Sequence, residues 1–250
     1  MTEPRVLVID VETAPLTLSG WGLREQNFGL AQVLETSRLL CFAAKWYGKP
    51  RVHFSSEWQH GQAGMLERAH KLLSDADVVV AHNAPFDVKQ FNTAFLLAGM
   101  SPPAPFQTID TLRAVRSRFF LASNRLDHIA RVLGLGQKVS HEGHGLWLRV
   151  LDGHGPSRRL MREYNEHDVI LCEAVLEALW SKGWVPDGPH VGAIAGRPDG
   201  CPQCGGARLH ARGVARTKVS AYQRFQCQDC GGWCRGNKAL PGRATTRGVR

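Results

Sequence analysis

The sequence predicts an α/β protein built on a mixed β-sheet, followed by a small cysteine-rich module and a basic tail. Three apolar stretches typical of strands come first, and alternating helical and strand patterns follow, which is the order of a mixed-sheet α/β domain. The 250 residues are 43% hydrophobic, enough for one sizeable core with a small appendage. Five of the seven cysteines fall between positions 201 and 250, which indicates a separate module there.

Strands and helices are expected along the first 182 residues. Short apolar runs bounded by turn residues indicate buried strands, and apolar residues spaced three or four apart indicate helices. The expected strands are Arg5–Ile9, Leu39–Trp46, Arg51–Ser55, Asp77–Ala81 and Thr108–Thr111. The expected helices are Gly61–Ser74, Pro85–Gly99, Leu112–Phe119, Arg125–Leu133, Gly145–Leu151 and Pro156–Lys182. Residues 185–200 are rich in Pro and Gly and are expected to form a linker.

The positive charge is concentrated near the C-terminus. The formal net charge is +9, yet residues 1–196 hold 20 basic and 20 acidic residues, and the remainder holds 11 basic and 2 acidic ones. This distribution predicts attraction to a polyanion such as nucleic acid, with a merely solvated tail as the alternative. No long apolar segment occurs and none follows a basic N-terminus, so we expect a soluble, unsecreted, cytoplasmic protein without a membrane partner.

At two places in the sequence, acidic side chains occupy positions where a carboxylate needs a partner. Asp10 and Glu12 lie at the end of the first expected strand, where the two-residue period puts both on one face. A divalent cation such as Mg²⁺ would relieve their repulsion, and exposure to solvent in the next loop is the alternative. Asp87 falls near a helix N-terminus, where the helix dipole favours an acid, but it shares an inward stripe with Phe91.

Asp168 lies on the apolar stripe of the long expected helix, one turn beyond Tyr164. An isolated buried carboxylate is unfavourable, so this side chain requires a partner. A metal ion would satisfy it, and the alternative is an ion pair with one of three arginines, Arg113, Arg116 or Arg118.

Taken together, three segments resemble the exonuclease motifs of the DEDD superfamily in order and spacing. They are Asp10-Val11-Glu12-Thr13, Asn83-Ala84-Pro85-Phe86-Asp87 and Tyr164-Asn165-Glu166-His167-Asp168. The tyrosine resembles the DEDDy branch, which includes ribonuclease D and the proofreading domains of several DNA polymerases, whereas the DEDDh branch has histidine at the position of Glu163. The resemblance covers residues 1 to about 182 and implies a ribonuclease H-like fold, a five-stranded mixed sheet flanked by helices. It also implies two Mg²⁺ or Mn²⁺ ions, held by Asp10, Glu12, Asp87 and Asp168.

The implied activity is that of a 3′-5′ exonuclease. Two metal ions can stabilise the attacking and leaving oxygens at phosphorus, while Tyr164, with an ordinary pKa of about 10, is suited to orienting the attacking water. The expected substrate is single-stranded DNA with a free 3′ end, in replication, repair or proofreading in trans, and Asn83 and Phe86 are candidate contacts. RNA trimming like that of ribonuclease D is one alternative. A non-catalytic adaptor on a nuclease-like scaffold is another, with a replisome protein as a candidate partner.

Several other polar residues are left open. Asp110 resembles a recurrent Asp-Thr segment of these nucleases but equally suits the N-terminus of a helix. His141 and His144 have a spacing that permits metal binding, although the neighbouring glycines favour a loop, with substrate contact as a further alternative. Arg125 and Lys138 flank a helix that is placed to follow a nucleic-acid backbone, and surface solvation explains them equally well.

The C-terminal module has the pattern of a zinc ribbon. Two Cys-x-x-Cys pairs, each followed by glycine and separated by 22 residues, predict one tetrahedral Zn²⁺ on Cys201, Cys204, Cys227 and Cys230, with reduced unliganded thiols as the alternative. Cys234 is expected to be a bystander. Cys41 and Cys172 are expected to be core thiols. The expected divisions are a nuclease domain at 1–184, a linker at 185–200, a ribbon at 201–236 and a basic flexible tail at 237–250.

Aromatic and basic residues alternate around the second cysteine pair. Tyr222, Phe225 and Trp233 lie near the candidate nucleic-acid-binding residues Arg216, Lys218 and Arg224. Rings can stack on bases while cations neutralise phosphates, and the alternative is that the rings form the core of the ribbon. A stand-alone exonuclease joined to such a ribbon resembles bacteriophage proteins.

Overall fold

The computed structural model describes residues 4–21, 27–185, 190–194 and 196–242, so the end of the basic tail and part of the expected linker lie outside the described residues. The central sheet has five strands in the order β5-β4-β1-β6-β7. They are β1 (Val6–Thr13), β4 (Leu39–Trp46), β5 (Val52–Ser56), β6 (Val78–Ala81) and β7 (Gln107–Asp110). β4 is antiparallel to β1 and β5, while β6 is parallel to β1 and β7. The predicted mixed α/β sheet is confirmed.

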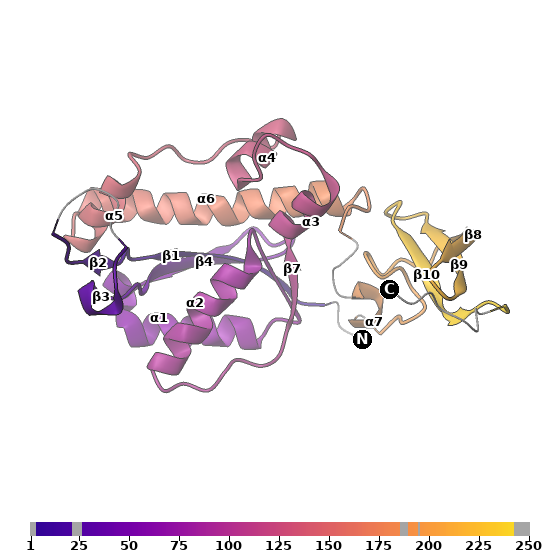
Figure 1. Cartoon of the computed structure of the whole chain (residues 1–250), viewed down its shortest axis with the longest axis horizontal. Coiled ribbons are helices and arrows are strands. Elements are labelled where there is room, and N and C mark those ends of the chain that lie inside the picture. The colour runs from indigo at the N-terminus through magenta and orange to yellow at the C-terminus, as the bar shows by residue number, and fades with distance from the viewer. Residues whose placement is uncertain (1–3, 22–26, 186–189, 195, 243–250) are drawn as a thin grey trace.

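Helices cover both faces of this sheet (Figure 1). On one face lie α1 (Glu57–Ser74) and α2 (Ala84–Leu97), and on the other lie α3 (Thr111–Arg118), α4 (Leu126–Val132) and α6 (Gly155–Trp180). Alternate residues of β1 serve the two faces: Leu7 and Ile9 pack with α1 and α2, whereas Val6 and Val8 pack with α6. The same alternation directs the next residues of the Val6–Val8 series, Asp10 and Glu12, towards α6.

A third apolar cluster fixes the first half of α6. Leu146 and Val150 of α5 (His144–Leu151) pack against Met161 of α6 and against Cys41 of β4. Farther along, Glu173 of α6 forms an ion pair with Lys45 of β4 and accepts a hydrogen bond from the Gly48 backbone N–H at 2.8 Å. These contacts hold α6 along the sheet. Cys41 and Cys172 are buried, as predicted.

Several element boundaries differ from those predicted. β1 continues four residues past Ile9 because β4 pairs with it as far as Thr13, so Asp10 and Glu12 lie within the strand and not in a loop after it. α1 begins at Glu57, since one helical turn precedes a kink at Gly61, where φ is 67°. Four short elements were not predicted: β2 (Thr17–Leu18), η1 (Leu30–Gln32), β3 (Val33–Glu35) and α7 (Val191–Ile194). The last of these lies within the expected linker.

The C-terminal module, residues 201–239, contains an antiparallel sheet of order β10-β9-β8. Its strands are β8 (Leu209–Arg216), β9 (Ala221–Cys227) and β10 (Trp233–Ala239). The module contacts the end of α6, because the Trp180 indole N–H donates a hydrogen bond to the Gln203 carbonyl at 2.6 Å. None of the helices in the described parts of the chain has the length and apolar character needed to span a membrane.

Candidate active site and cysteine site

Three of the predicted acids lie together between β1 and α6. Asp10, Glu12 and Asp168 each offer a carboxylate oxygen, and these oxygens lie within 4.8 Å of one another. Asp168 is only 1% exposed, and its Oδ1 is buried without a hydrogen-bond partner. A buried carboxylate oxygen without a partner is unfavourable, and a divalent cation is a ligand that would satisfy it. The donor set of this acidic cluster therefore fits a hard metal ion.

The fourth predicted acid, Asp87, lies beside this cluster but outside the group of three. β6 pairs with β1 only as far as Val8, so the backbone of β1 beyond that point is open on the β6 side. Asp87, buried in the first turns of α2, fills this opening, and its Oδ1 accepts a hydrogen bond from Val11 N–H at 3.2 Å. Asp87 thereby contacts the strand between the two acids of β1.

Lys138 supplies the positive charge at the acidic cluster. Its ammonium group forms an ion pair with Asp168 and lies 3.0 Å from the Tyr164 hydroxyl oxygen. Among the described residues the ion-pair partner of Asp168 is therefore this lysine, and not one of the three arginines considered from the sequence. Lys138 follows α4 in a loop, and the sequence offered no sign that a residue thirty positions before Asp168 faces it.

Asn165 is a second residue whose role the sequence did not reveal. Its side-chain amide donates hydrogen bonds to Asp10 Oδ2 at 2.6 Å and to the Asp10 carbonyl at 3.2 Å. Asn165 is fully buried and lies one turn before Asp168 on α6. Its position next to Tyr164 in the third motif was the available signal. Asn165 fixes the orientation of the Asp10 carboxylate relative to α6.

Burial and mutual repulsion make these carboxyl groups weaker acids than usual. Burial raises the pKa of Asp10 to about 7, with a further contribution from the charge of Asp168. Burial and the charge of Asp10 raise the pKa of Glu12 and that of Asp87 well above their usual values. Lys138 opposes these shifts at Asp10 and Glu12. One ammonium group for several carboxyl groups leaves a negative excess that added cations would neutralise.

Tyr164 lies at the rim of the cluster with its hydroxyl group protonated. Burial and the charge of Asp168 raise the pKa of this phenol above its usual value. The His141 ring is 4.8 Å from the Tyr164 ring, edge to face, and Trp147 packs against both. Glu163, which stands where a histidine-type nuclease would carry its histidine, is exposed instead. Tyr164 is therefore the residue of this pair that faces the cluster.

A pocket of about 780 Å³ opens from the acidic cluster and has a basic rim. Asp10 and Tyr164 line it, and the cationic or imidazole side chains lining it are Arg125, Arg131, Lys138, His82 and His141. An adjoining pocket of about 350 Å³ shares His82 and Arg125 and adds Arg116. Acids that fit a cation thus lie beside basic groups that attract an anion.

The remaining candidate residues have different positions. Asp110 caps α3, accepting hydrogen bonds from Leu112 N–H at 3.0 Å and Arg113 N–H at 3.3 Å, as the helix-terminal alternative predicted. Asn83 is exposed in a left-handed conformation (φ 85°) at the start of α2, and Phe86 is 44% exposed. His144 is exposed, and the two groups of described residues that could hold a metal ion contain no histidine.

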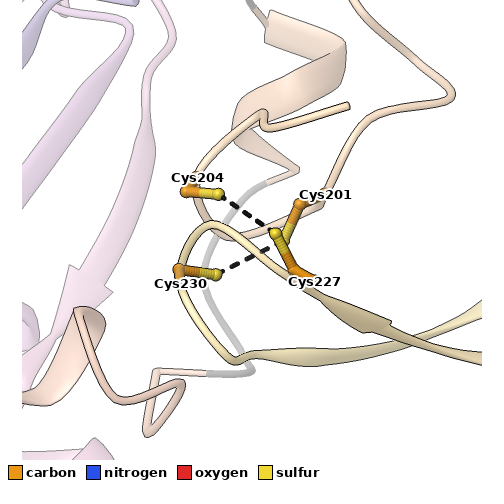
Figure 2. A group of neighbouring side chains, drawn as sticks. All are labelled: Cys201, Cys204, Cys227 and Cys230. Carbon is orange, nitrogen blue, oxygen red and sulfur yellow. Dashed lines mark hydrogen bonds between the residues drawn. The ribbon is translucent and has the colours of Figure 1, made fainter. Parts of the chain in front are cut away.

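The four predicted cysteines converge on one point (Figure 2). The Sγ atoms of Cys201 and Cys230 are 3.7 Å apart, as are those of Cys204 and Cys227. A tetrahedral zinc site with Zn–S bonds of about 2.3 Å has sulfur–sulfur edges of about 3.8 Å. The backbone N–H groups of Gly206 and Asp229 each lie 3.4 Å from a cysteine sulfur, where they favour thiolates. The cluster therefore fits Zn²⁺. Cys234 lies outside this group.

The predicted nucleic-acid-binding residues of the module do not share one face. Arg224 of β9 pairs with Arg235 of β10, whereas Arg216 of β8 pairs with Ala221 of β9. Because neighbouring positions of a strand point to opposite faces, Arg216 lies on the face opposite to Arg224. Lys218 lies in the turn between β8 and β9.

A comparison with models of protein families agrees with this architecture. A family model described as the RNase H superfamily matches residues 29–180, more than half of the chain. This matched segment includes Asp87 and Asp168 but begins after Asp10 and Glu12. No curated protein matches this chain. The crystal structure of Trypanosoma brucei RNase D is similar, with a TM-score of 0.47 and 16% identity over 76% of this chain and 62% of that chain. The chain thus spans less than two thirds of the length of that structure.

Proposed function

The chain belongs to the RNase H superfamily, and we propose that it is a metal-dependent 3′-5′ exonuclease of the DEDDy type that acts on single-stranded DNA. The observation that carries the proposal is the acidic cluster itself, in which three buried or half-buried carboxyl groups meet and one buried oxygen has no partner. The three sequence motifs supply the direction of hydrolysis by their resemblance to 3′-5′ exonucleases. DNA is the substrate proposed from that resemblance, and RNA is tested against it below.

Asp10, Glu12 and Asp168 would hold two Mg²⁺ or Mn²⁺ ions, with Asp87 beside them. Bound there, the ions would lower the pKa of the attacking water and stabilise the attacking and leaving oxygens at phosphorus. Asn165 fixes the Asp10 carboxylate through the 2.6 Å hydrogen bond, so this ligand needs little reorganisation.

Tyr164 and Lys138 act on the reacting groups in different ways. Tyr164 keeps its proton because its pKa is raised, so its hydroxyl orients the attacking water by hydrogen bonding and does not accept a proton from it. Lys138 holds the Asp168 carboxylate and the Tyr164 hydroxyl together at the mouth of the basic-rimmed pocket. The scissile phosphate would enter through this pocket.

A degradation assay with a matched pair of α6 variants tests the proposal. The substrates are 5′-labelled single-stranded DNA, 3′-mismatched duplex DNA and single-stranded RNA, each with Mg²⁺, Mn²⁺ or EDTA. Asp168→Asn removes a cluster charge, whereas Glu163→Gln makes the same chemical change on the exposed side of the helix. We expect the wild type to produce a ladder that shortens from the 3′ end. The rate of hydrolysis should fall about a thousandfold or more in Asp168→Asn and stay unchanged in Glu163→Gln.

Two outcomes would contradict the proposal. Hydrolysis that survives in Asp168→Asn would remove the acidic cluster from the reaction. Degradation of RNA with DNA left intact would replace the proposed substrate with RNA.

A second proposal concerns the cysteine site. We propose that Cys201, Cys204, Cys227 and Cys230 bind one structural Zn²⁺ as the centre of a zinc ribbon. It rests on the two 3.7 Å sulfur–sulfur distances and on the N–H groups directed at the sulfurs. A purified protein with one equivalent of zinc, lost in Cys227→Ser and retained in Cys234→Ser, is the expected result.

A further inference from the structure

One face of the sheet in the C-terminal module combines aromatic rings with arginines. The strand register places Tyr222 and Arg224 of β9 on the same face as Trp233 and Arg235 of β10. The Arg224 guanidinium lies 4.9 Å from the centre of the Trp233 ring, and that of Arg235 lies 3.9 Å from the centre of the Tyr222 ring. We call these four residues the Arg–aromatic face.

The two arginines of this face lie directly opposite each other on neighbouring strands. Like charges in this arrangement destabilise a sheet. Between residues 207 and 242 the sequence contains one acid, Asp229, and its carboxylate is engaged by Arg208. Stacking on a ring stabilises a guanidinium but leaves its positive charge in place. The Arg–aromatic face thus concentrates positive charge that an anion would neutralise.

Arg224 is already oriented for such an anion. Its Nε–H donates a hydrogen bond to the Arg212 carbonyl at 2.8 Å, and its guanidinium stacks on Trp233. These contacts fix the plane of the guanidinium and leave its terminal nitrogens for a ligand. A planar guanidinium matches the paired oxygens of a phosphate group.

The exposed ring of Trp233 narrows the choice of anion. Trp233 is 49% exposed. Phe225 of β9, which points to the other face of the sheet, is half-buried. A partly exposed ring beside two arginines offers a stacking surface for a planar group that is joined to phosphates. An unpaired nucleic-acid strand has both, whereas the bases of a duplex are already stacked on one another. An acidic peptide would use the arginines but would leave the exposed part of the Trp233 ring uncovered.

We propose that the Arg–aromatic face binds a single strand of nucleic acid, with phosphates on Arg224 and Arg235 and a base on Trp233. This binding site is separate from the acidic cluster and does not require hydrolysis. It also differs from the set of residues expected from the sequence, because Arg216 lies on the opposite face and Lys218 lies in a turn.

The test is equilibrium binding by the full-length chain without added Mg²⁺ or Mn²⁺. The probes are a fluorescein-labelled oligothymidylate with phosphorothioate linkages, the equivalent oligouridylate and a duplex of the same length. The variants are Trp233→Ala, Trp233→Phe and the double variant Arg224→Ala/Arg235→Ala. The matched control is Arg216→Ala/Lys218→Ala, which removes the same charge from the opposite face of the sheet and from the turn between β8 and β9. Zinc content and thermal unfolding of each variant establish that the module is folded.

We expect Trp233→Ala to weaken binding to either single strand by about tenfold or more, and Trp233→Phe to retain most of it. Arg224→Ala/Arg235→Ala should make the negative slope of log K against log salt concentration less steep by about 1.4. The slope of the control variant should change little. Equal losses in the two double variants would overturn the proposal, since they would indicate diffuse attraction. Binding that Trp233→Ala leaves intact, or that is as tight for the duplex, would overturn it as well. A catalytically inactive protein that still binds through this face would leave this inference standing while the nuclease proposal fails.

Discussion

At the scale of single residues, the ionised carboxyl groups of the acidic cluster destabilise the folded chain when no metal ion is bound. Asp10 has an ordinary pKa of 3.8 and a pKa of about 7 in the folded chain, chiefly because of burial. Between these values the folded chain binds a proton that the unfolded chain releases. Protonation therefore favours folding, and this contribution is lost as the pH rises through about 7.

This shift predicts how stability depends on pH. In metal-free buffer we expect the wild-type protein to lose stability between about pH 4 and pH 7, and the pKa difference at Asp10 corresponds to about 4 kcal/mol. Asp10→Asn, which cannot ionise, should flatten the profile, and added Mg²⁺ should stabilise the wild type most above pH 7. Urea unfolding across this pH range measures both effects. A variant with the same slope as the wild type would show that Asp10 does not cause it.

Tyr164 is the residue for which catalysis and structure are most easily separated. Removing its hydroxyl in Tyr164→Phe leaves the ring contacts with His141 and Trp147 in place. If the hydroxyl orients the attacking water, kcat should fall about tenfold to a hundredfold with KM nearly unchanged. Tyr47→Phe, a hydroxyl deletion beside Trp180 at the other end of α6, serves as the control. A rise in KM with kcat unchanged would assign Tyr164 to substrate binding instead.

At the scale of elements, Asp110 joins the start of α3 to the start of α2. Its Oδ1 accepts hydrogen bonds from the N–H groups of Leu112, Arg113 and Asn83, the last at 3.0 Å. Asn83 precedes the helix that carries Asp87. One carboxylate therefore supports the starts of two helices, α2 and α3, which follow the neighbouring parallel strands β6 and β7.

We expect Asp110→Ala to destabilise the protein by about 1–2 kcal/mol and Asp110→Asn to destabilise it less, because asparagine also caps helices well. Thermal or urea unfolding measures the difference. Metal-dependent hydrolysis by the folded Asp110→Ala protein should stay within a few-fold of the wild type. Loss of hydrolysis without loss of stability would place Asp110 among the metal ligands instead.

Elements with strong periodic patterns were predictable, and those fixed by tertiary pairing were not. β4 was identified because apolar residues fill most of its eight positions. α6 was identified because its apolar stripe recurs over several helical turns. β1 was predicted to stop at Ile9 because Asp10 and Glu12 interrupt its apolar run, yet pairing with β4 extends it to Thr13. The carboxylates that ended the pattern are the ones the fold directs towards α6.

At the scale of the whole molecule, the site combines residues far apart in the sequence. Asp10, Glu12, Asp87 and Asp168 were singled out because each stands at a position where a carboxylate needs a partner. Asn165 was not, and Lys138 was considered only as a contact to a nucleic-acid backbone, because a lysine in a loop and an asparagine in a helix have ordinary surface explanations. Only the packing of α6 on β1, and of the loop after α4 on α6, brings Lys138 and Asn165 to Asp168 and Asp10.

The C-terminal module should depend on the proposed zinc ion far more than the rest of the chain depends on any metal. Among the described residues of the module, the buried apolar side chains are those of Cys201 and Cys227, so the module lacks an apolar core of its own. The sheet of the nuclease-like part, in contrast, is covered by two large apolar clusters. If the four cysteines bind zinc as proposed, folding of the module should come chiefly from that binding.

Removing zinc with a chelator that spares Mg²⁺ should unfold the module and leave the five-stranded sheet folded. The indole of Trp180 donates its N–H to Gln203, so its fluorescence should change on zinc loss, and Trp180→Phe should abolish most of that change. Limited proteolysis should then cut within residues 201–239, while hydrolysis of a short single strand by the remaining part persists. A module that stays protected from protease after zinc loss would show that its stability comes from packing against α6. Because Trp180 is the last residue of α6, that result would make the module and the nuclease-like part a single folding unit.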